Sequence, residues 1–326
     1  MPTSPAGRAG DAVLALDIGG TKTAAAVVRD GVLDRLPSAP TPTDSAVSIE
    51  ELVVSYAVQA AERGSLTGVG LSVAGFIDGD RARVNLAPNL PLTGHDLGGR
   101  LTTRLGLPVW VENDVNAAAW GEFRAGRATS SATSSVSSAA SPFVLVMVGT
   151  GLGGGVVVEG RLLRGGRGAA GEIGHLELVE GGRPCGCGLR GCWEQYASGT
   201  ALVRRAREEL AAGRASTLAE LSEPVTGHDV LKAARGGDEL ARELYAELGV
   251  HLGRGIAMLS VVIDPSLVVL GGGVAAASDF FLPSLQATLA ARTDRALPLP
   301  TLVCSTLGGD APLLGMADLA AAGFPG

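Results

Sequence analysis

Several features that would place this chain in a familiar class are scarce. Lysine is nearly absent: only Lys22 and Lys232 occur, so arginine supplies almost all of the 26 basic side chains. With 33 acidic side chains, the net charge is −7, which argues against a nucleic-acid binder held by phosphate contacts. We therefore expect no nucleic-acid partner.

Long apolar runs are also missing. No stretch of 18 consecutive apolar residues occurs, and the longest candidate, 256–277, is interrupted by Asp264-Pro265 and by three glycines. A helix that spans a bilayer needs about 20 apolar residues, so we expect no membrane partner. The first 11 residues do not carry the apolar core of a secretory signal either. The expected location is therefore cytoplasmic.

Cysteine is rare, but its placement is informative. Three of the four cysteines, Cys185, Cys187 and Cys192, lie within eight residues. In a chain without an export signal this spacing favours metal binding over disulfides, and a Cys-x-Cys pair is poorly placed to form its own disulfide. With His175 they make a Cys₃His set, which is typical of a closed structural zinc site. Cys304 stands apart, and we expect a small buried apolar residue.

Glycine, by contrast, is abundant. It accounts for 48 of 326 residues, about twice the average usage of ~7%, and it does not follow the Gly-X-Y repeat of collagen. Two segments rich in glycine and threonine, 17–23 and 149–155, each lie between two short apolar runs. Each pattern predicts strand, turn, strand. The repetition suggests an internal duplication.

The remaining sequence alternates between strand and helix patterns, which predicts an α/β fold, and the length suggests about two domains. The expected helices are 49–63, 115–124, 201–212, 238–260, and a last one that begins at the cap signal Asp310-Ala311-Pro312 and runs to 322. The expected strands include 69–73, 109–111, 261–263 and 267–270. Segment 128–141 is almost entirely Ser, Ala and Thr, so it buries too little apolar surface to offset its ordering entropy. We interpret it as a flexible surface insertion.

The paired glycine segments suggest phosphate binding, because glycine lets backbone N–H groups approach an anion and threonine adds hydroxyl donors. A P-loop is disfavoured, since Thr21 precedes Lys22 and the chain continues like a hairpin. A dinucleotide-binding turn is disfavoured, because 156–160 is too short and too β-like for the helix that such a turn opens. Two hairpins facing one nucleotide, as in actin-like ATPases, fit both segments. Glycines that merely make tight turns are the remaining alternative.

Five motifs occur in order: Asp-Ile-Gly-Gly-Thr-Lys-Thr, Glu-Asn-Asp-Val-Asn-Ala, Gly-Thr-Gly-Leu-Gly-Gly-Gly, Gly-Glu-Ile-Gly-His and Cys-Gly-Cys-Gly-Leu-Arg-Gly-Cys-Trp-Glu. With them the chain resembles the ROK family of sugar kinases, particularly the zinc-containing bacterial glucokinases, over nearly its whole length. The resemblance implies a two-lobed, actin-like (ribonuclease H-like) fold with a central cleft. It implies a small α/β lobe of residues 1–118, joined by the C-terminal helix 310–326, and a larger α/β lobe of residues 119–309. The Ser-rich segment departs from the family pattern.

The activity implied by the resemblance is ATP-dependent phosphorylation of glucose to glucose 6-phosphate. Asp114 is the expected general base on the sugar 6-hydroxyl. It lies where a strand ends and a helix begins, so the helix dipole favours its ionised form, although a helix N-cap is the alternative from the local sequence. The resemblance implies sugar contacts from Gly75, Asn89, Asn113, Asp114, Glu172, His175 and Glu194. For Asn89 an Asx-turn, and for Glu172 and Glu194 a surface position, are the alternatives.

The resemblance also implies the metal and nucleotide contacts. Asp17 is the candidate for organising Mg²⁺ through water, because Mg²⁺ usually takes one or two carboxylates plus phosphate oxygens. The ATP phosphates would be faced by Gly19, Gly20, Thr21, Lys22, Thr23, Thr150, Gly151 and Gly153, and the nucleoside by Gly271, Gly272 and Gly273. His175 would bind structural zinc with one ring nitrogen and a sugar hydroxyl with the other. We assign no role to His95, His228 and His251.

Other activities stay open. The sequence does not separate glucokinase from a kinase for mannose, N-acetylglucosamine or N-acetylmannosamine, nor ATP from polyphosphate as donor, although polyphosphate users of the family tend to lack the cysteine cluster. A sugar-sensing ROK regulator would carry an N-terminal helix-turn-helix, and about 12 residues before the first strand are too few for one. The expected assembly is a homodimer or homotetramer.

Overall fold

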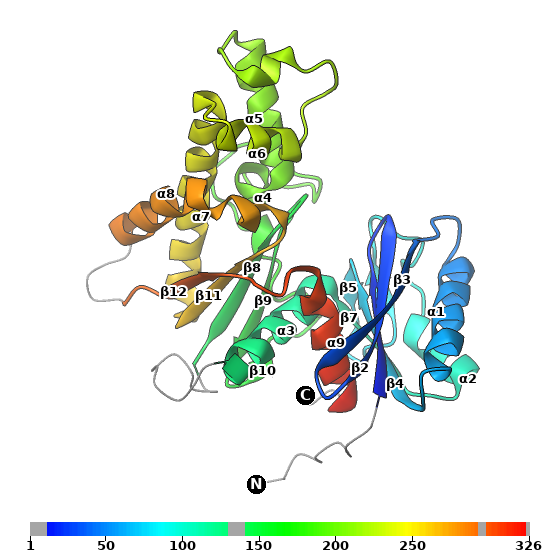
Figure 1. The fold of residues 1–326 in the computed structure, drawn as a ribbon. Helices are drawn as coiled ribbons and strands as arrows, with labels where there is room; N and C mark the ends of the chain where they lie inside the picture. The colour runs from blue at the N-terminus through cyan, green and yellow to red at the C-terminus, as the bar shows by residue number, and fades with distance from the viewer. Residues whose placement is uncertain (1–11, 130–140, 293–297, 324–326) are drawn as a thin grey trace. The chain divides into compact units, whose positions relative to one another are not determined.

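The structure, a computed structural model, describes residues 12–129, 141–292 and 298–323. It contains two compact units (Figure 1). Unit 1 comprises residues 1–140, 155–171 and 309–326, and unit 2 comprises residues 141–154 and 172–308. Most of the segment that we interpret as a flexible insertion, residues 130–140, lies outside the described residues.

Unit 1 is built on a five-stranded sheet in the order β3-β2-β1-β4-β7. Strands β1 (Ala12–Ile18), β2 (Lys22–Arg29) and β3 (Val32–Pro40) form an antiparallel meander, which confirms the first predicted hairpin. Strands β4 (Leu66–Val73) and β7 (Val109–Asn113) continue the sheet in parallel with β1. A small ribbon of β5 (Phe76–Ile77) and β6 (Val84–Leu86) follows β4.

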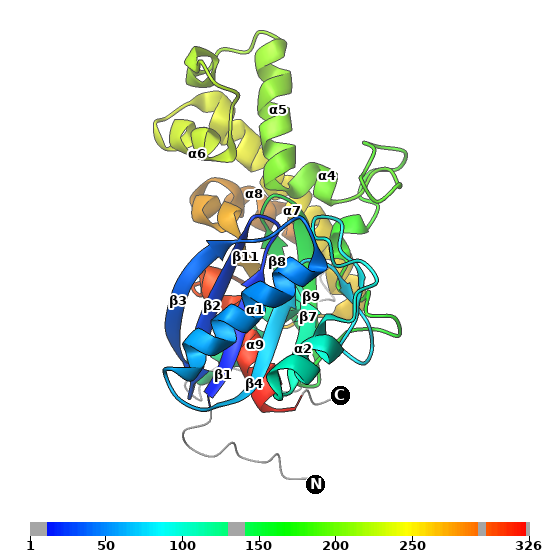
Figure 2. The same cartoon turned by 90° about the vertical axis from the view of Figure 1, so that its right-hand side faces the viewer.

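Helices cover both faces of this sheet. Helices α1 (Ala46–Ala61) and α2 (Leu97–Leu105) lie on one face, as Figure 2 shows, and α9 (Ala311–Ala321) packs on β1 and β4 from the other, beside α3 (Asp114–Thr129). The side chain of Ser45 caps α1. Asp310 takes the N-cap position of α9, but its carboxylate pairs with Arg35 instead of capping the helix.

The expected boundary between residues 118 and 119 is not where the units divide, because α3 continues in unit 1 past this point. The cause is the close packing of α3 on α9. A Cβ on Gly315 would lie 1.8 Å from the carbonyl oxygen of Ala117, and one on Gly121 would lie 2.1 Å from that of Ala311. The two helix backbones therefore touch, and residues 119–129 stay with unit 1. The segment 155–171 belongs to the same unit.

A second five-stranded sheet has the same plan, in the order β10-β9-β8-β11-β12, and its strands β8, β11 and β12 lie in unit 2. Strands β8 (Phe143–Val148) and β9 (Leu152–Val158) form the second predicted hairpin, and β10 (Arg161–Leu162) extends it. Strands β11 (Leu267–Gly271) and β12 (Thr301–Cys304) follow in parallel with β8. Three strands consecutive in sequence and then two parallel strands occur in both sheets, which supports the duplication.

The helices of unit 2 surround the long helix α7 (Glu239–Ile263), which packs on α4, α5, α6 and α8. The shorter elements are η2 (Ile173–His175), α4 (Glu194–Ala197), α5 (Gly199–Ala211), η3 (Thr217–Glu220), α6 (Gly227–Arg235), η4 (Gly273–Ala277) and α8 (Ser278–Arg292). The short turn η5 (Gly308–Asp310) directly precedes α9. Within the described ranges, α7 is the one helix long and apolar enough to cross a bilayer, and half of its apolar window is buried. A core helix passes the same test.

The strand predicted at 261–263 is wrong, because these residues form the last turn of α7. Val261 and Val262 are β-branched, as residues of strands often are, but their side chains are 71% and 78% exposed. They are therefore not packed in a buried strand. The helix ends at Ile263, and the next residue, Asp264, adopts a left-handed conformation (φ 49°) and donates its N–H to the carbonyl of Ser260. The following Pro265 disfavours further helix at this point.

Candidate active site and metal centre

Three polar side chains line up across the sheet of unit 1 near the carboxyl ends of its parallel strands. Asp17 on β1 is in register with Ser72 on β4, and Ser72 is in register with Glu112 on β7. The hydroxyl of Ser72 donates to Asp17 Oδ1 at 2.7 Å. Ligands of open α/β sheets bind outside the carboxyl ends of the strands. This row therefore marks one edge of unit 1 as a candidate site.

Burial raises the pKa of Asp17, and the hydrogen bond from Ser72 only partly opposes the rise. Between its ordinary pKa, about 4, and the raised value, the folded protein binds more protons than the unfolded chain. Stability therefore falls as the pH rises through that window. A buried carboxylate with a shifted pKa at the end of a strand is a candidate functional group.

We expect Asp17→Asn to raise the melting temperature at pH 7, because the variant no longer buries a carboxylate. The gain should shrink as the pH is lowered and vanish well below pH 4, where Asp17 of the wild type is protonated in both states. Thermal melts of both proteins between pH 3 and pH 8 measure this. A variant that is less stable than the wild type at pH 7 would show that the ionised carboxylate stabilises the fold.

Glu112 is buried and holds the start of α3. Its Oε2 accepts from Arg164 Nε at 2.6 Å, and its Oε1 accepts from the backbone N–H of Asn113 at 3.0 Å and from Asn116 Nδ2 at 3.2 Å. No role was predicted for Glu112 from the sequence. Its place in the Glu-Asn-Asp motif, two residues before the expected base Asp114, was the available signal.

Asn113 is the N-cap of α3. Its Oδ1 accepts from the backbone N–H groups of Val115 and Asn116 at 2.9 and 3.0 Å, and its Nδ2 donates to the carbonyl of Gly75 at 3.1 Å. The capping role considered for Asp114 therefore belongs to its neighbour. Asp114 is the first residue of the helix, where the helix N-terminus favours a negative charge.

Gly75 is a glycine because the backbone of a neighbouring segment passes too close for a side chain. A Cβ there would lie 2.5 Å from the carbonyl oxygen of Leu86 and 3.3 Å from Cα of Ala87. The glycine thus lets the 86–87 segment pass close to the end of β4, a different reason from the predicted approach of a sugar. Asn89, three residues after Leu86, is exposed. A Cβ on Gly20 would lie 3.5 Å from the Cβ of Asn89.

The first glycine turn closes the β1–β2 hairpin. The N–H of Gly19 donates to the carbonyl of Lys22 at 3.1 Å, and Thr21 and Lys22 are exposed. Thr23, predicted to face phosphate, is instead fully buried, and its hydroxyl is hydrogen bonded to that of Thr41 at 2.8 Å. The reason is that Thr23 already belongs to β2 and pairs with Ile18 of β1.

The second glycine turn, in unit 2, is tied to the helices that follow it. Thr200 donates its hydroxyl to the carbonyl of Thr150 at 2.8 Å. Glu194 Oε2 accepts from the backbone N–H of Leu152 at 3.1 Å, and a Cβ on Gly151 would lie 2.3 Å from that oxygen. The carboxylate of Glu194 therefore lies against the turn. Gly153 lies inside β9, past the turn.

A cavity of ≈ 1190 Å³ opens in unit 2 beside this turn. It is lined by Gly149, Thr150, Gly199, Thr200, Leu202, Val203, Arg204, Arg207, Glu208, Ala211, Val225, Thr226, Gly227, His228, Leu231, Tyr245, Gly273 and Val274. The glycine segments at the two ends of this list were predicted from the sequence, whereas the walls between them, including His228, were not. They come from α5, α6 and α7, which share no local pattern.

Of the three glycines predicted to line the nucleoside, Gly273 lines this cavity. Gly272 adopts φ 86°, where a Cβ would lie 2.3 Å from the carbonyl oxygen of Val148. Gly271 ends β11, and its Cβ would meet Met147 Sδ at 3.2 Å. These two shape the backbone beside the cavity and are absent from its lining.

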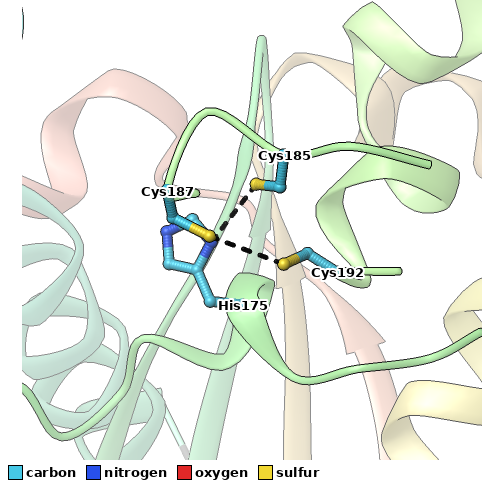
Figure 3. A group of neighbouring side chains, drawn as sticks. All are labelled: His175, Cys185, Cys187 and Cys192. Carbon is cyan, nitrogen blue, oxygen red and sulfur yellow. Dashed lines mark hydrogen bonds between the residues drawn. The ribbon is translucent and has the colours of Figure 1, made fainter. Parts of the chain in front are cut away.

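The Cys₃His set comes together as predicted. The ligand atoms of His175, Cys185, Cys187 and Cys192 all lie within 4.8 Å of one another, and their side chains converge in Figure 3. His175 Nδ1 lies 3.7 Å from Cys185 Sγ, and the sulfurs of Cys187 and Cys192 are 3.6 Å apart. Zinc–sulfur bonds of about 2.3 Å in a tetrahedron give sulfur spacings of about 3.8 Å. Donor type, number and spacing therefore fit structural zinc.

The loop around these ligands depends on its glycines. Gly188 and Gly191 adopt φ 90° and 76°, and a Cβ on Gly191 would lie 1.9 Å from the carbonyl oxygen of Val179. Cys304 lies outside the group, on β12, and is half-buried, whereas we expected a buried residue.

His175 also faces the carboxylate of Glu172. The two are the start and end of the η2 turn, and His175 Nε2 lies 3.9 Å from Glu172 Oε2. Burial, and to a lesser extent the charge of Glu194, raises the pKa of Glu172, whereas His175 lowers it. Glu172, His175 and Glu194 thus form one polar group in unit 2.

Two sheets of one plan, each opened by a glycine-turn hairpin, define an actin-like ATPase fold, which the structural neighbours confirm. The chain belongs to the ROK family, whose model matches residues 13–322. The glucokinase of Streptomyces coelicolor is 37% identical over 319 residues, 94% of this chain and 96% of that protein. An N-acetylmannosamine kinase of Escherichia coli is 34% identical over 321 residues, 94% of this chain and 97% of that protein. The ROK family glucokinase of Streptomyces griseus, solved with glucose and AMPPNP, has a TM-score of 0.80 at 37% identity, covering 94% of this chain and 98% of that chain.

Proposed function

We propose that this protein is an ATP-dependent glucokinase that transfers the γ-phosphoryl group of ATP to the 6-hydroxyl of glucose. The observation that carries the proposal is the cavity beside Gly149 and Thr150, in a chain that is 37% identical to glucokinases. Its walls include the apolar side chains of Leu202, Val225 and Val274. A nucleoside has apolar faces to cover such walls and polyphosphate has none, which favours ATP as the donor.

Asp114 accepts the proton of the 6-hydroxyl as the sugar oxygen attacks the γ-phosphorus in line and ADP leaves. The Asn113 cap and the Glu112 contacts on either side fix the backbone that carries it. Thr21, Lys22 and the backbone N–H groups of the two glycine turns bind the phosphates. When bound, Mg²⁺ neutralises phosphate charge, and Asp17 is the carboxylate that would hold it through water.

Sugar binding is assigned to the polar groups described for each unit: Asn89, Asn113 and Asp114 of unit 1, and Glu172, His175 and Glu194 of unit 2. Carboxylates accept from hydroxyls, amides both donate and accept, and a neutral sugar needs both kinds of partner. Zinc would be held by His175, Cys185, Cys187 and Cys192. It would fix the imidazole orientation and leave the second ring nitrogen for a sugar hydroxyl.

We also propose a cytoplasmic location and a homodimeric or homotetrameric assembly. A kinase for N-acetylmannosamine is the second candidate, since a relative of that activity is 34% identical over nearly the whole chain. The two substrates differ at C2, where N-acetylmannosamine carries a bulky amide, so the panel of sugars decides between them.

The experiment is a coupled assay of the purified protein against glucose, mannose, N-acetylglucosamine and N-acetylmannosamine, with ATP and with polyphosphate as donor. We expect the highest kcat/KM for glucose with ATP. Preference for an N-acetylated hexose would assign the second candidate. Turnover of no sugar with either donor would refute a kinase.

A further inference from the structure

The loop that carries the cysteines also contacts the wall of the cavity in unit 2. We call residues 177–193 the Cys-rich loop. Two residues before Cys185, Arg183 donates from Nη1 and Nη2 to the two carboxylate oxygens of Glu208, each at 2.7 Å. This is the paired, parallel geometry in which a guanidinium and a carboxylate bind most specifically.

Glu208 belongs to α5 and lines the cavity. Arg205, on the same helix, donates to Glu208 at 3.0 Å and also reaches Glu209 and Glu247, so α5 is braced against α7. Arg204, another lining residue, donates to Oε1 of Gln195 at 3.1 Å, just past the Cys-rich loop. Helix α5, which forms part of the cavity wall, is thus hydrogen bonded to the Cys-rich loop at Arg183 and to the residue Gln195 that follows it.

The Cys-rich loop has little packing of its own. Among residues 180–190, Cys185 is the one buried residue. The loop is anchored at its base, where the backbone N–H of Arg183 donates to the hydroxyl of Tyr196 at 2.8 Å and Trp193 Nε1 donates to the carbonyl of His251 at 2.9 Å. A loop of this kind takes its order from the metal, so that binding free energy becomes ordering free energy.

We propose that metal in the Cys₃His cluster raises nucleotide affinity by ordering Arg183 against Glu208. With the loop ordered, Arg183 neutralises a carboxylate at the cavity and holds α5 in place. With the loop disordered, Glu208 keeps more of its negative charge beside an anionic ligand, and the wall loses one attachment. Linkage is reciprocal, so bound nucleotide must retain the metal by the same factor.

The inference rests on the proposed function in one respect, namely that the cavity binds ATP. The test therefore measures binding. The dissociation constant of AMPPNP is determined by titration calorimetry for the zinc-loaded and the chelator-stripped full-length protein, as wild type, Arg183→Gln, Glu208→Gln and the control Arg190→Gln. Arg190 is an exposed arginine of the same loop that donates to the carbonyl of Gly181 within the loop.

We expect removal of zinc to weaken AMPPNP binding about 5-fold or more in the wild type and in Arg190→Gln, the lower range of typical coupling between sites. In Arg183→Gln and Glu208→Gln, stripping should change it less than about 2-fold. AMPPNP should correspondingly slow zinc loss to a chelator in the wild type and leave it unchanged in Arg183→Gln. Circular dichroism of each stripped protein confirms that the rest of the chain stays folded.

Equal zinc dependence in Arg183→Gln and wild type would overturn the inference while leaving the kinase proposal intact. A wild type that binds AMPPNP equally well with and without zinc would overturn it as well. If the wild type binds no AMPPNP in either form, the proposed function fails, and the inference fails with it.

Discussion

Asp114→Asn is expected to lower kcat by about 10²–10⁴-fold, the usual contribution of a positioned general base. The substitution keeps the size and the hydrogen-bonding reach of the side chain and removes its ability to accept the proton. Because Asn113, and not Asp114, caps α3, the helix should start in the same place and the melting temperature should change little. Glucose binding, measured by calorimetry without ATP, should stay within about 3-fold of the wild type.

The matched control is Asp30→Asn. Asp30 is exposed in the β2–β3 turn at φ 49°, a conformation that Asn also tolerates, so the control makes the same change of charge without strain. It should turn over at the wild-type rate. Turnover of Asp114→Asn within about 10-fold of the wild type would show that another group takes the proton. Loss of glucose binding in that variant would assign Asp114 to sugar recognition instead.

The features that the sequence predicted well are the ones that local chemistry determines. Both hairpins follow from short apolar runs that flank glycine turns, and the Cys₃His set follows from ligands that lie close together in the sequence. Helices expected at 49–63, 115–124, 201–212 and 238–260 occur within a few residues of those bounds. Each of these patterns is complete within about 25 residues.

The rest needed contacts between distant segments. The α3–α9 contact at Gly121 and Gly315 moved the unit boundary, and nothing near either glycine indicates the partner helix. Thr23 looked like a turn residue, but strand pairing buries it. Gly75 was assigned to a ligand, although the backbone at Leu86 already requires it. The cavity walls combine three helices, so the sequence indicated only the glycine segments at the two ends of the lining.

Removing the metal should have the second large effect. We expect Cys187→Ser, or the wild type stripped by a chelator, to lose glucose affinity by about 10–100-fold, the usual effect of disturbing the partners of a metal ligand. The reason is that His175 belongs both to the cluster and to the polar group with Glu172. Without a metal bond on one ring nitrogen, the imidazole is no longer held in one orientation for the sugar. The melting temperature should fall as well, because metal binding free energy is also ordering free energy.

Cys304→Ser is the matched control for this experiment, because Cys304 lies on β12, outside the cluster. It should retain the zinc content, the glucose affinity and most of the stability of the wild type, whereas Cys187→Ser should lose all three. Zinc is quantified by atomic emission, and glucose binding by calorimetry. Re-adding zinc distinguishes loss of the metal from irreversible damage to the protein. If glucose affinity recovers in the stripped wild type but not in Cys187→Ser, the loss in that variant is caused by the missing fourth ligand. Stripped protein that binds and phosphorylates glucose at the wild-type level would mean that the protein alone holds His175 in place.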